Sequence, residues 1–286
     1  MSDFNAVLAQ YEKSKQTTSG NQNKVSNEDR LKKYFACVLP KGVKNEERRI
    51  RILPTKDGSS PFIEVDFHEV QVDGKWVKIY DPKQEGKRSP LTEVAEGLAM
   101  TGDPADKVLS KNYKPRKFYI VKVIDRDNEQ DGAKFWRFKY AYKGDGIFDK
   151  IVPIYKNKKN IDDPELGRDL ILSLGLAKSN AGKDYTIITS IIPDDISPLN
   201  TDKVISDSWV SDELVWSDVY AKRSEEYLVL VANGEVPKWS KESNKWVSSE
   251  AMGEETIGSN TSNETSTTTP IVDPQENDEP TEDLPF

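Results

Sequence analysis

Two stretches of the sequence alternate basic and aromatic residues. The first runs from Lys111 to Tyr119 and the second from Lys134 to Lys143. This combination suits single-stranded nucleic acid, because Lys and Arg neutralise phosphates while aromatic rings stack on bases at roughly 1–3 kcal/mol per base. Alternation also fits strands whose rings face a core, and it does not show which rings face outward. We predict a binding groove that contains Lys111, Tyr113, Lys114, Arg116, Lys117, Tyr119, Trp136, Arg137, Lys139 and Tyr140.

A third basic segment, Arg48–Lys56, precedes these stretches. Arg49 and Arg51 share one face of the expected strand, because side chains alternate with a period of two, and Lys56 follows in a loop. Taken alone, such a segment is more often a solvated strand face than a binding site. Beside the two basic-aromatic stretches, we predict that Arg49, Arg51 and Lys56 also contact nucleic acid.

Residues suited to catalysis or metal binding are scarce. The chain has one cysteine, Cys37, and one histidine, His68, which is too few for a Cys/His zinc site. It contains no Gly-rich phosphate loop and no apolar-flanked carboxylate pair for acid–base work. The only dense carboxylates lie between two expected strands and are Asp125, Asp127, Glu129 and Asp131. We expect no catalytic residue, no cofactor and no metal.

The formal net charge of −8 is unevenly distributed along the 286 residues. Residues 1–160 carry a net charge of +9, residues 161–247 carry −7, and residues 248–286 carry −10 with no basic residue. An acidic protein would ordinarily be a poor candidate for binding nucleic acid, but a ligand responds to the local field. Both basic-aromatic stretches lie in the +9 block, so the overall charge does not exclude this function.

The elements that would position these residues are mostly strands. Alternating and apolar runs predict strands over residues 34–39, 48–53, 62–72, 75–80, 117–124, 134–142 and 185–192. Asp73-Gly74 is typical of a hairpin turn. Short helices are expected over residues 92–100 and 163–174. This pattern predicts a mainly β (α+β) protein with an OB-fold core, inserted short helices, a C-terminal helical segment and a disordered acidic tail.

The sequence divides into four predicted segments. Residues 1–28 form an N-terminal arm and linker with an amphipathic helix near the start, and residues 29–200 form the OB-fold core. Residues 201–247 form a helical and hairpin extension, with a helix expected over residues 211–232. Residues 248–286 form the tail, whose composition cannot bury enough apolar area to offset the entropy of ordering.

The tail ends in an acidic run followed by an aromatic residue at the free carboxylate. Such an end can dock an apolar pocket with a basic rim on another protein, and we predict partner docking by Asp283, Leu284, Pro285 and Phe286. No apolar run approaches the roughly 18 residues that span a bilayer, and residues 1–4 lack a signal-peptide pattern. With a single cysteine, the chain is expected in a reducing cytoplasm, without a membrane partner.

The order of these motifs resembles the single-stranded DNA-binding (helix-destabilising) protein family of T-even-type bacteriophages. The resemblance extends over roughly residues 30–200 and rests on Ile50–Lys56, Pro61-Phe62, His68, Gly74-Lys75-Trp76, the basic stretch 111–125, Phe135–Tyr140 and Ile147–Ile151. It implies an OB-fold core whose groove binds single-stranded DNA (ssDNA). It also implies a basic N-terminal arm for cooperative binding and an acidic tail that recruits replication proteins.

The resemblance assigns roles to several residues. It places Arg51 at a DNA-contacting position and residues 111–117 in the family's basic strand. The family's arm motif, which implies self-association along ssDNA, is loosely matched by Lys13, Lys15, Thr17 and Thr18. The tail tip is more similar to that of bacterial single-stranded DNA-binding proteins, which suggests host as well as phage partners.

The resemblance also implies a zinc site, but this sequence departs from it. His68 stands at the position of the zinc histidine, while Asp81, Ser89 and Thr92 replace the three cysteines. Hydroxyls are poor zinc ligands beside thiolates. We therefore expect no metal, with its place taken by packing of Leu91, Val94 and Leu98.

The sequence thus predicts a non-enzymatic protein that coats ssDNA during phage replication, recombination and repair in the cytoplasm of an infected bacterium. Its expected partners are ssDNA and phage or host replication and recombination proteins. An RNA-binding OB module would use the same groove. An enzyme of DNA metabolism would need a carboxylate cluster such as residues 125–131. A pure protein adaptor is disfavoured by the basic-aromatic stretches.

Overall fold

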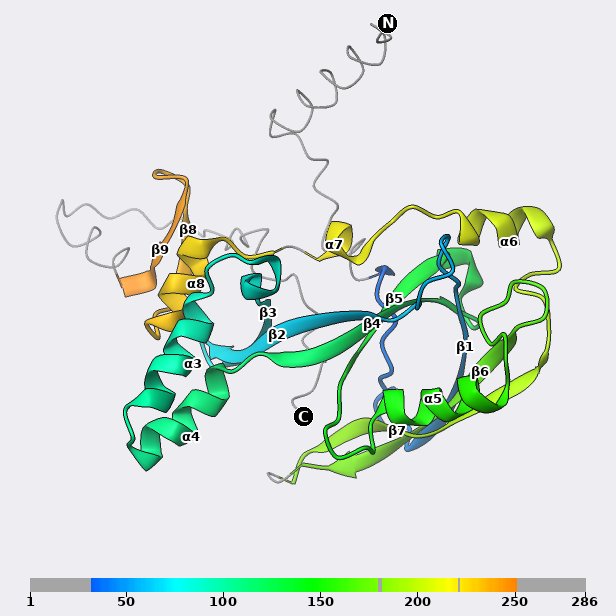
Figure 1. The fold of residues 1–286 in the computed structure, drawn as a ribbon, viewed down its shortest axis with the longest axis horizontal. Coiled ribbons are helices and arrows are strands. Elements are labelled where there is room, and N and C mark those ends of the chain that lie inside the picture. The colour runs from blue at the N-terminus through cyan, green and yellow to red at the C-terminus, as the bar shows by residue number, and fades with distance from the viewer. Residues whose placement is uncertain (1–31, 180–181, 221, 251–286) are drawn as a thin grey trace, which may run out of the picture.

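The computed structural model describes residues 32–179, 182–220 and 222–250 (Figure 1). Within this part, the chain is an α+β protein with a large antiparallel sheet in the order β3-β2-β4-β1-β6-β7, and β5 also pairs with β4. The strands are β1 (Asn45–Ile52), β2 (Ile63–Val72), β3 (Lys75–Tyr80), β4 (Arg116–Asp125), β5 (Ala133–Lys139), β6 (Arg168–Lys178) and β7 (Asp184–Ile196). The sheet does not close into a barrel among these residues, so the coarse α+β prediction is confirmed and the OB-type barrel is not.

The helices connect the strands and form much of the C-terminal part. They are α3 (Pro90–Met100), α4 (Pro104–Tyr113), α5 (Ile147–Asn157), α6 (Lys203–Val210), α7 (Trp216–Val219) and α8 (Glu225–Ala232), with short 3-10 turns η1 (Pro82–Glu85) and η2 (Glu129–Asp131). A separate hairpin follows, formed by β8 (Pro237–Ser240) and β9 (Lys245–Ser248). In the described ranges, no helix is both long enough and apolar enough to cross a membrane.

Strand β4 is the centre of the sheet. Strand β5 pairs with β4 from Phe118 to Ile124, while β2 pairs with the first half of β4 and β1 with its last three residues. Two separate apolar cores therefore meet on the two sides of this one strand. We call the side of odd-numbered β4 residues, such as Tyr119 and Val121, the inner face, and the side of even-numbered residues, such as Phe118, the outer face.

The inner face holds the larger core, between β4, β5, β1, β6 and helix α5. The outer face is covered by the segment after α6, where Trp216 packs against Phe67 with ring centroids 6.3 Å apart. A third core joins α3 and α8 to β2, β3 and β9. In Figure 1 this helical part lies at one end of the long β2 and β4 strands, and α5 with β6 and β7 lies at the other end.

Residues 33–39 run between β5 and β7. Phe135 donates its backbone N–H to the carbonyl of Lys33 at 2.7 Å, and Phe35 donates to Phe135 at 2.9 Å. Further on, the backbone N–H of Leu39 donates to Thr186 Oγ1 on β7 at 3.0 Å. Only an isolated parallel bridge forms at this place rather than the predicted strand, although Phe35 and Leu39 are buried in the inner core.

Two predicted helices are wrong. Residues 163–174 form a turn followed by β6, because Asp163 Oδ1 accepts hydrogen bonds from the backbone N–H groups of Glu165 and Leu166, and apolar burial then alternates with the period of a strand. The helix predicted over residues 211–232 is broken into α7 and α8, and Ser224 caps the start of α8. The expected helix near the N-terminus lies outside the described residues.

Candidate nucleic-acid interface

One row of side chains crosses three strands where the inner face leaves the core. The backbone N–H of Tyr140, just after β5, donates to the carbonyl of Lys117 on β4 at 2.9 Å. Lys117 in turn lies opposite Asp66 on β2. Residues that face each other across neighbouring strands project to the same side of the sheet. This row therefore places a ring, a cation and a carboxylate side by side.

The next row inward supports the first and is closed to ligands. Tyr119 is buried and stacks on Phe148 of α5, with ring centroids 4.1 Å apart. The hydroxyl of Tyr119 donates to Glu64 at 3.2 Å, and Lys117 Nζ donates to the same carboxylate at 2.6 Å. The hydrogen bond from Lys117 lowers the pKa of Glu64. The prediction that Tyr119 lies in the binding groove is wrong, because its side chain is buried and stacks on Phe148.

Tyr140 of the first row and Tyr142, which follows it in the chain, form an aromatic surface. Tyr140 is half-buried, and Tyr142 is 79% exposed, with the two ring centroids 4.8 Å apart at an interplanar angle of 83°. Tyr140 also lies 6.1 Å from Tyr119, so the rings continue outward from the core. Sequence reasoning missed Tyr142, although it closes the second basic-aromatic stretch and is followed by exposed Lys143.

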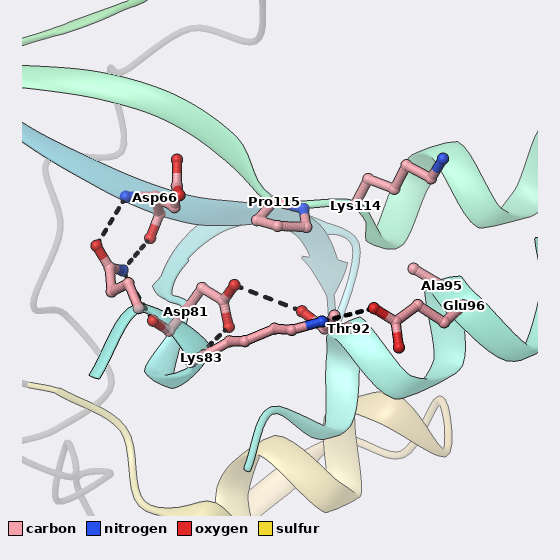
Figure 2. A pocket seen from close by; sticks show the side chains of 9 residues that line it. Asp66, Asp81, Lys83, Thr92, Ala95, Glu96, Lys114 and Pro115 are labelled. Carbon is pink, nitrogen blue, oxygen red and sulfur yellow. Dashed lines mark hydrogen bonds and ion pairs between the residues drawn. The ribbon is translucent and has the colours of Figure 1, made fainter. Parts of the chain in front are cut away.

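A hollow of about 530 Å³ lies at the other end of the row (Figure 2). It is lined by Asp66, Asp81, Lys83, Gln84, Thr92, Ala95, Glu96, Lys114 and Pro115. Lys114 is exposed at the end of α4, and Lys111 is exposed on that helix. The predicted basic strand therefore begins only at Arg116, because Asp103 caps a helix that extends to Tyr113. Tyr113 is half-buried and packs against the third core.

The position of Arg51 differs from the prediction that it contacts nucleic acid. Its side chain is completely buried, and its guanidinium donates to Asp169 Oδ1 at 3.1 Å and to the carbonyl of Ser197. Burial is the largest influence on Arg51 and lowers its pKa, while Asp169 opposes this effect. A phosphate cannot reach this side chain without opening the sheet, so the structure contradicts Arg51 as a DNA contact.

Trp136 is a second correction, because it lies in the inner core, 2% exposed, against the edge of Phe35. Three further predicted residues lie on the outer face. Lys139 donates to Glu69, and Arg116 pairs with that same carboxylate at 3.3 Å. Arg137 lies over the ring of Phe67, at 5.2 Å from its centroid. These three cations are thus separated from Lys117 by the sheet itself.

Arg49 and Lys56 are exposed but lie away from the row. Arg49 pairs with Asp194 at 3.3 Å, and Lys56 pairs with Glu213 at 3.5 Å. Of the predicted groove residues, the structure therefore brings together Lys117, Tyr140 and Lys114 and does not bring Arg49 or Lys56 to them.

His68 and the three residues Asp81, Ser89 and Thr92 come together in the structure. His68 is completely buried and donates from Nδ1 to the carbonyl of Tyr113 at 2.7 Å, while its Nε2 lies 3.4 Å from both Asp81 and Ser89. Thr92 donates to the other oxygen of Asp81 at 3.4 Å. One imidazole and one carboxylate with two hydroxyls do not fit a zinc site. Across the described residues, no group of three or more His, Cys, Asp or Glu side chains could hold a metal.

This polar group instead connects the helical part to the sheet. Its members come from β2, the end of β3 and the start of α3. Leu91, which directly precedes Thr92, is fully buried in the third core. Val94 and Leu98 are only half-buried. Hydrogen bonds together with the packing of Leu91 hold this end of α3.

The carboxylates between β4 and β5 are occupied by cations. Lys134 pairs with Asp125 at 3.3 Å and with Asp131 at 2.9 Å, and Arg126 pairs with Glu129 at 2.7 Å. Such pairs neutralise the carboxylates that a two-metal site would need. The predicted arm residues (Lys13, Lys15, Thr17 and Thr18) and tail residues (Asp283, Leu284, Pro285 and Phe286) lie outside the described part of the chain.

Comparison with protein-family models and with curated proteins found no match for this chain.

Proposed function

We propose that this protein binds single-stranded DNA without sequence specificity during phage DNA replication, recombination and repair, and has no enzymatic activity. The proposed binding surface is the inner-face row of Lys117 and Tyr140 together with Tyr142 and Lys114. The fold proposal that accompanies it is an OB-related core, with residues 33–39 lying between β5 and β7. The resemblance to the T-even-type phage family motivates both proposals.

The pair of half-buried Tyr140 and exposed Tyr142, beside lysines that are not buried, is the observation that carries this function. Tyr142 offers an open ring face next to Tyr140, and base stacking on such rings is tolerant of sequence because every base has a π-face. Lys117 and Lys114 lie along the same side of the sheet and supply the charge that phosphates require.

The remaining parts of the proposal come from the sequence. The tail would recruit phage or host replication and recombination proteins, and the arm would support self-association along ssDNA. The location would be the cytoplasm of an infected bacterial cell. Each of these is a proposal for the full chain, because the residues that carry it lie outside the described ranges.

The sharpest test compares two neighbouring cations on opposite faces of β4. The affinity of a fluorescein-labelled oligo-dT is measured by anisotropy at several salt concentrations. Lys117→Ala should reduce the slope of log K against log[salt] by about 0.7, the value for one phosphate contact on a single strand. Arg116→Ala should leave the slope unchanged, because Arg116 lies on the outer face with Glu69.

Ring variants complete this test. Tyr142→Ala should weaken binding by about 1–3 kcal/mol, while the salt slope stays the same because no charge is lost. Absence of oligo-dT binding by the native chain, or equal slope changes in the two cation variants, would reject the proposed surface. A matched RNA oligomer added as competitor distinguishes a DNA-binding protein from an RNA-binding one.

A further inference from the structure

Asp66 lines the hollow beside the row, and its backbone groups, but not its carboxylate, are hydrogen-bonded by Gln84. The N–H of Asp66 donates to Gln84 Oε1 at 3.1 Å, and Gln84 Nε2 donates back to the carbonyl of Asp66 at 2.9 Å. No side-chain hydrogen bond or ion pair joins the Asp66 carboxylate to another residue of the described ranges. Burial raises the pKa of Asp66, and Lys117 offsets only part of this effect.

The neighbouring charges in the hollow are already satisfied or lie at its rim. Lys83 pairs with Glu96 at 2.6 Å, and Asp81 accepts from Thr92. Figure 2 shows these contacts as dashed lines, while the side chains of Asp66 and Lys114 both point away from them. Asp66 and Lys114 thus line the hollow with a carboxylate and an ammonium that have no side-chain partner among the described residues.

A nucleobase with two adjacent N–H donors matches such a carboxylate. Guanine presents N1–H and the N2 amino group side by side, so both oxygens of one carboxylate can accept from it. Thymine has a single N–H between two carbonyls, and cytosine and adenine each place one amino group next to an acceptor nitrogen. Bidentate contacts to base edges provide the strongest discrimination among bases.

We propose that the hollow receives one unstacked base of the bound strand and that Asp66 makes guanine the preferred base there. This inference rests on the proposed function, since the strand must already lie on the row. Asp66 is two strands from Tyr140, a distance of about 10 Å at the usual strand spacing. The base at Asp66 and the base on Tyr140 therefore belong to different nucleotides, and the rest of the surface remains indifferent to sequence.

The test uses two oligomers that differ in one functional group. One is an oligothymidylate with deoxyguanosine at regular intervals, and the other carries deoxyinosine, which lacks the N2 amino group, at the same positions. The native chain should bind the guanine oligomer at least about fivefold more tightly, the lower end of a bidentate contact. Asp66→Asn should bring the ratio of the two affinities close to one. Asp66→Glu retains a carboxylate, so the guanine oligomer should still bind more tightly than the inosine oligomer.

Asp73→Asn is the matched control. It removes the same charge from the turn that follows β2, where a positive φ of 49° suits asparagine, and it should leave the affinity ratio as in the native chain. Using the ratio cancels the general gain in affinity that loss of any negative charge produces.

The outcomes separate this inference from the proposed function. If neither oligomer binds, the proposed function fails. If both bind with equal affinity, or if Asp66→Asn keeps the native ratio while remaining folded by circular dichroism, the guanine pocket is rejected and the ssDNA surface stands.

Discussion

Tyr119 of β4 and Phe148 of α5 stack with ring centroids 4.1 Å apart and an interplanar angle of 16°. The contact fixes the first turn of α5 against the sheet immediately beside Lys117 and Tyr140. Tyr140 and Tyr142, which follow β5, lie in the connection that leads into this helix. The stacked pair therefore positions the proposed interface without belonging to it.

Replacing Phe148 with alanine should lower the free energy of unfolding by about 2 kcal/mol, less than a fully buried phenylalanine would cost because the ring is half-buried. Urea denaturation measures this change. Tyr142→Ala, at a side chain that is 79% exposed, should change stability by less than about 0.5 kcal/mol. Equal losses for the two variants would show that the stacked pair does not anchor α5.

Arg51 is predicted to act in stability rather than in binding. Arg51→Ala should lower the free energy of unfolding by about 3 kcal/mol, because it breaks a buried pair with Asp169. Arg49→Ala, on the same strand and half-exposed, should cost less than about 1 kcal/mol. Neither variant should alter the salt slope of ssDNA binding. A normal stability with a reduced slope for Arg51→Ala would restore it as a DNA contact.

The Lys117–Glu64 pair predicts a pH dependence at acid pH. The hydrogen bond from Lys117 lowers the pKa of Glu64 below its ordinary value of 4.5. The stabilisation is therefore present above pH 4.5 and disappears as the pH falls through the lower, folded-state value. Glu64→Gln should cost well under 1 kcal/mol at pH 7, since the pair is exposed, and less at pH 3 than at pH 7.

Urea titrations of both proteins at the two pH values measure this difference. Glu47→Gln, an exposed position on β1, is the control and should leave the free energy of unfolding unchanged. A cost for Glu64→Gln that is the same at pH 3 and pH 7 would contradict the ionic origin of the contact.

Removal of the tail should raise the affinity for ssDNA at low salt. Truncation after Glu250 removes nine acidic residues and no basic one, and it keeps β9 intact, including the hydrogen bond from Ser249 to Val236. The gain should be clear at about 50 mM salt and fade above about 0.1 M, where exposed charges are screened. The physical reason is that the acidic tail and the DNA phosphates would compete for the same basic residues. An affinity that is the same with and without the tail at low salt would contradict this competition.

Local signals in the sequence predicted much of the sheet. The Asp73-Gly74 turn is confirmed, with φ of 49° and 74°, because its conformation depends on two adjacent residues. The face of each ring in β4 and β5 could not be predicted, since it depends on where α5 and β6 pack. Tyr119 and Trp136 turned inward for this reason.

The burial of a charged side chain such as Arg51 could not be predicted from local sequence either. Its partner Asp169 is 118 positions away in the sequence, so no local pattern announces the buried pair. The row of Asp66, Lys117 and Tyr140 likewise depends on the pairing of three strands. Spacing within one strand identifies a shared face, but contacts between distant strands decide what that face meets.

The bridge between Tyr34 and Phe135 has a geometric consequence for residues 1–31. It fixes the start of the described chain to the edge of β5. A chain of 31 residues spans at most about 110 Å when fully extended, at 3.3–3.6 Å per residue. Whatever residues 1–31 contact must therefore lie within about that distance of β5.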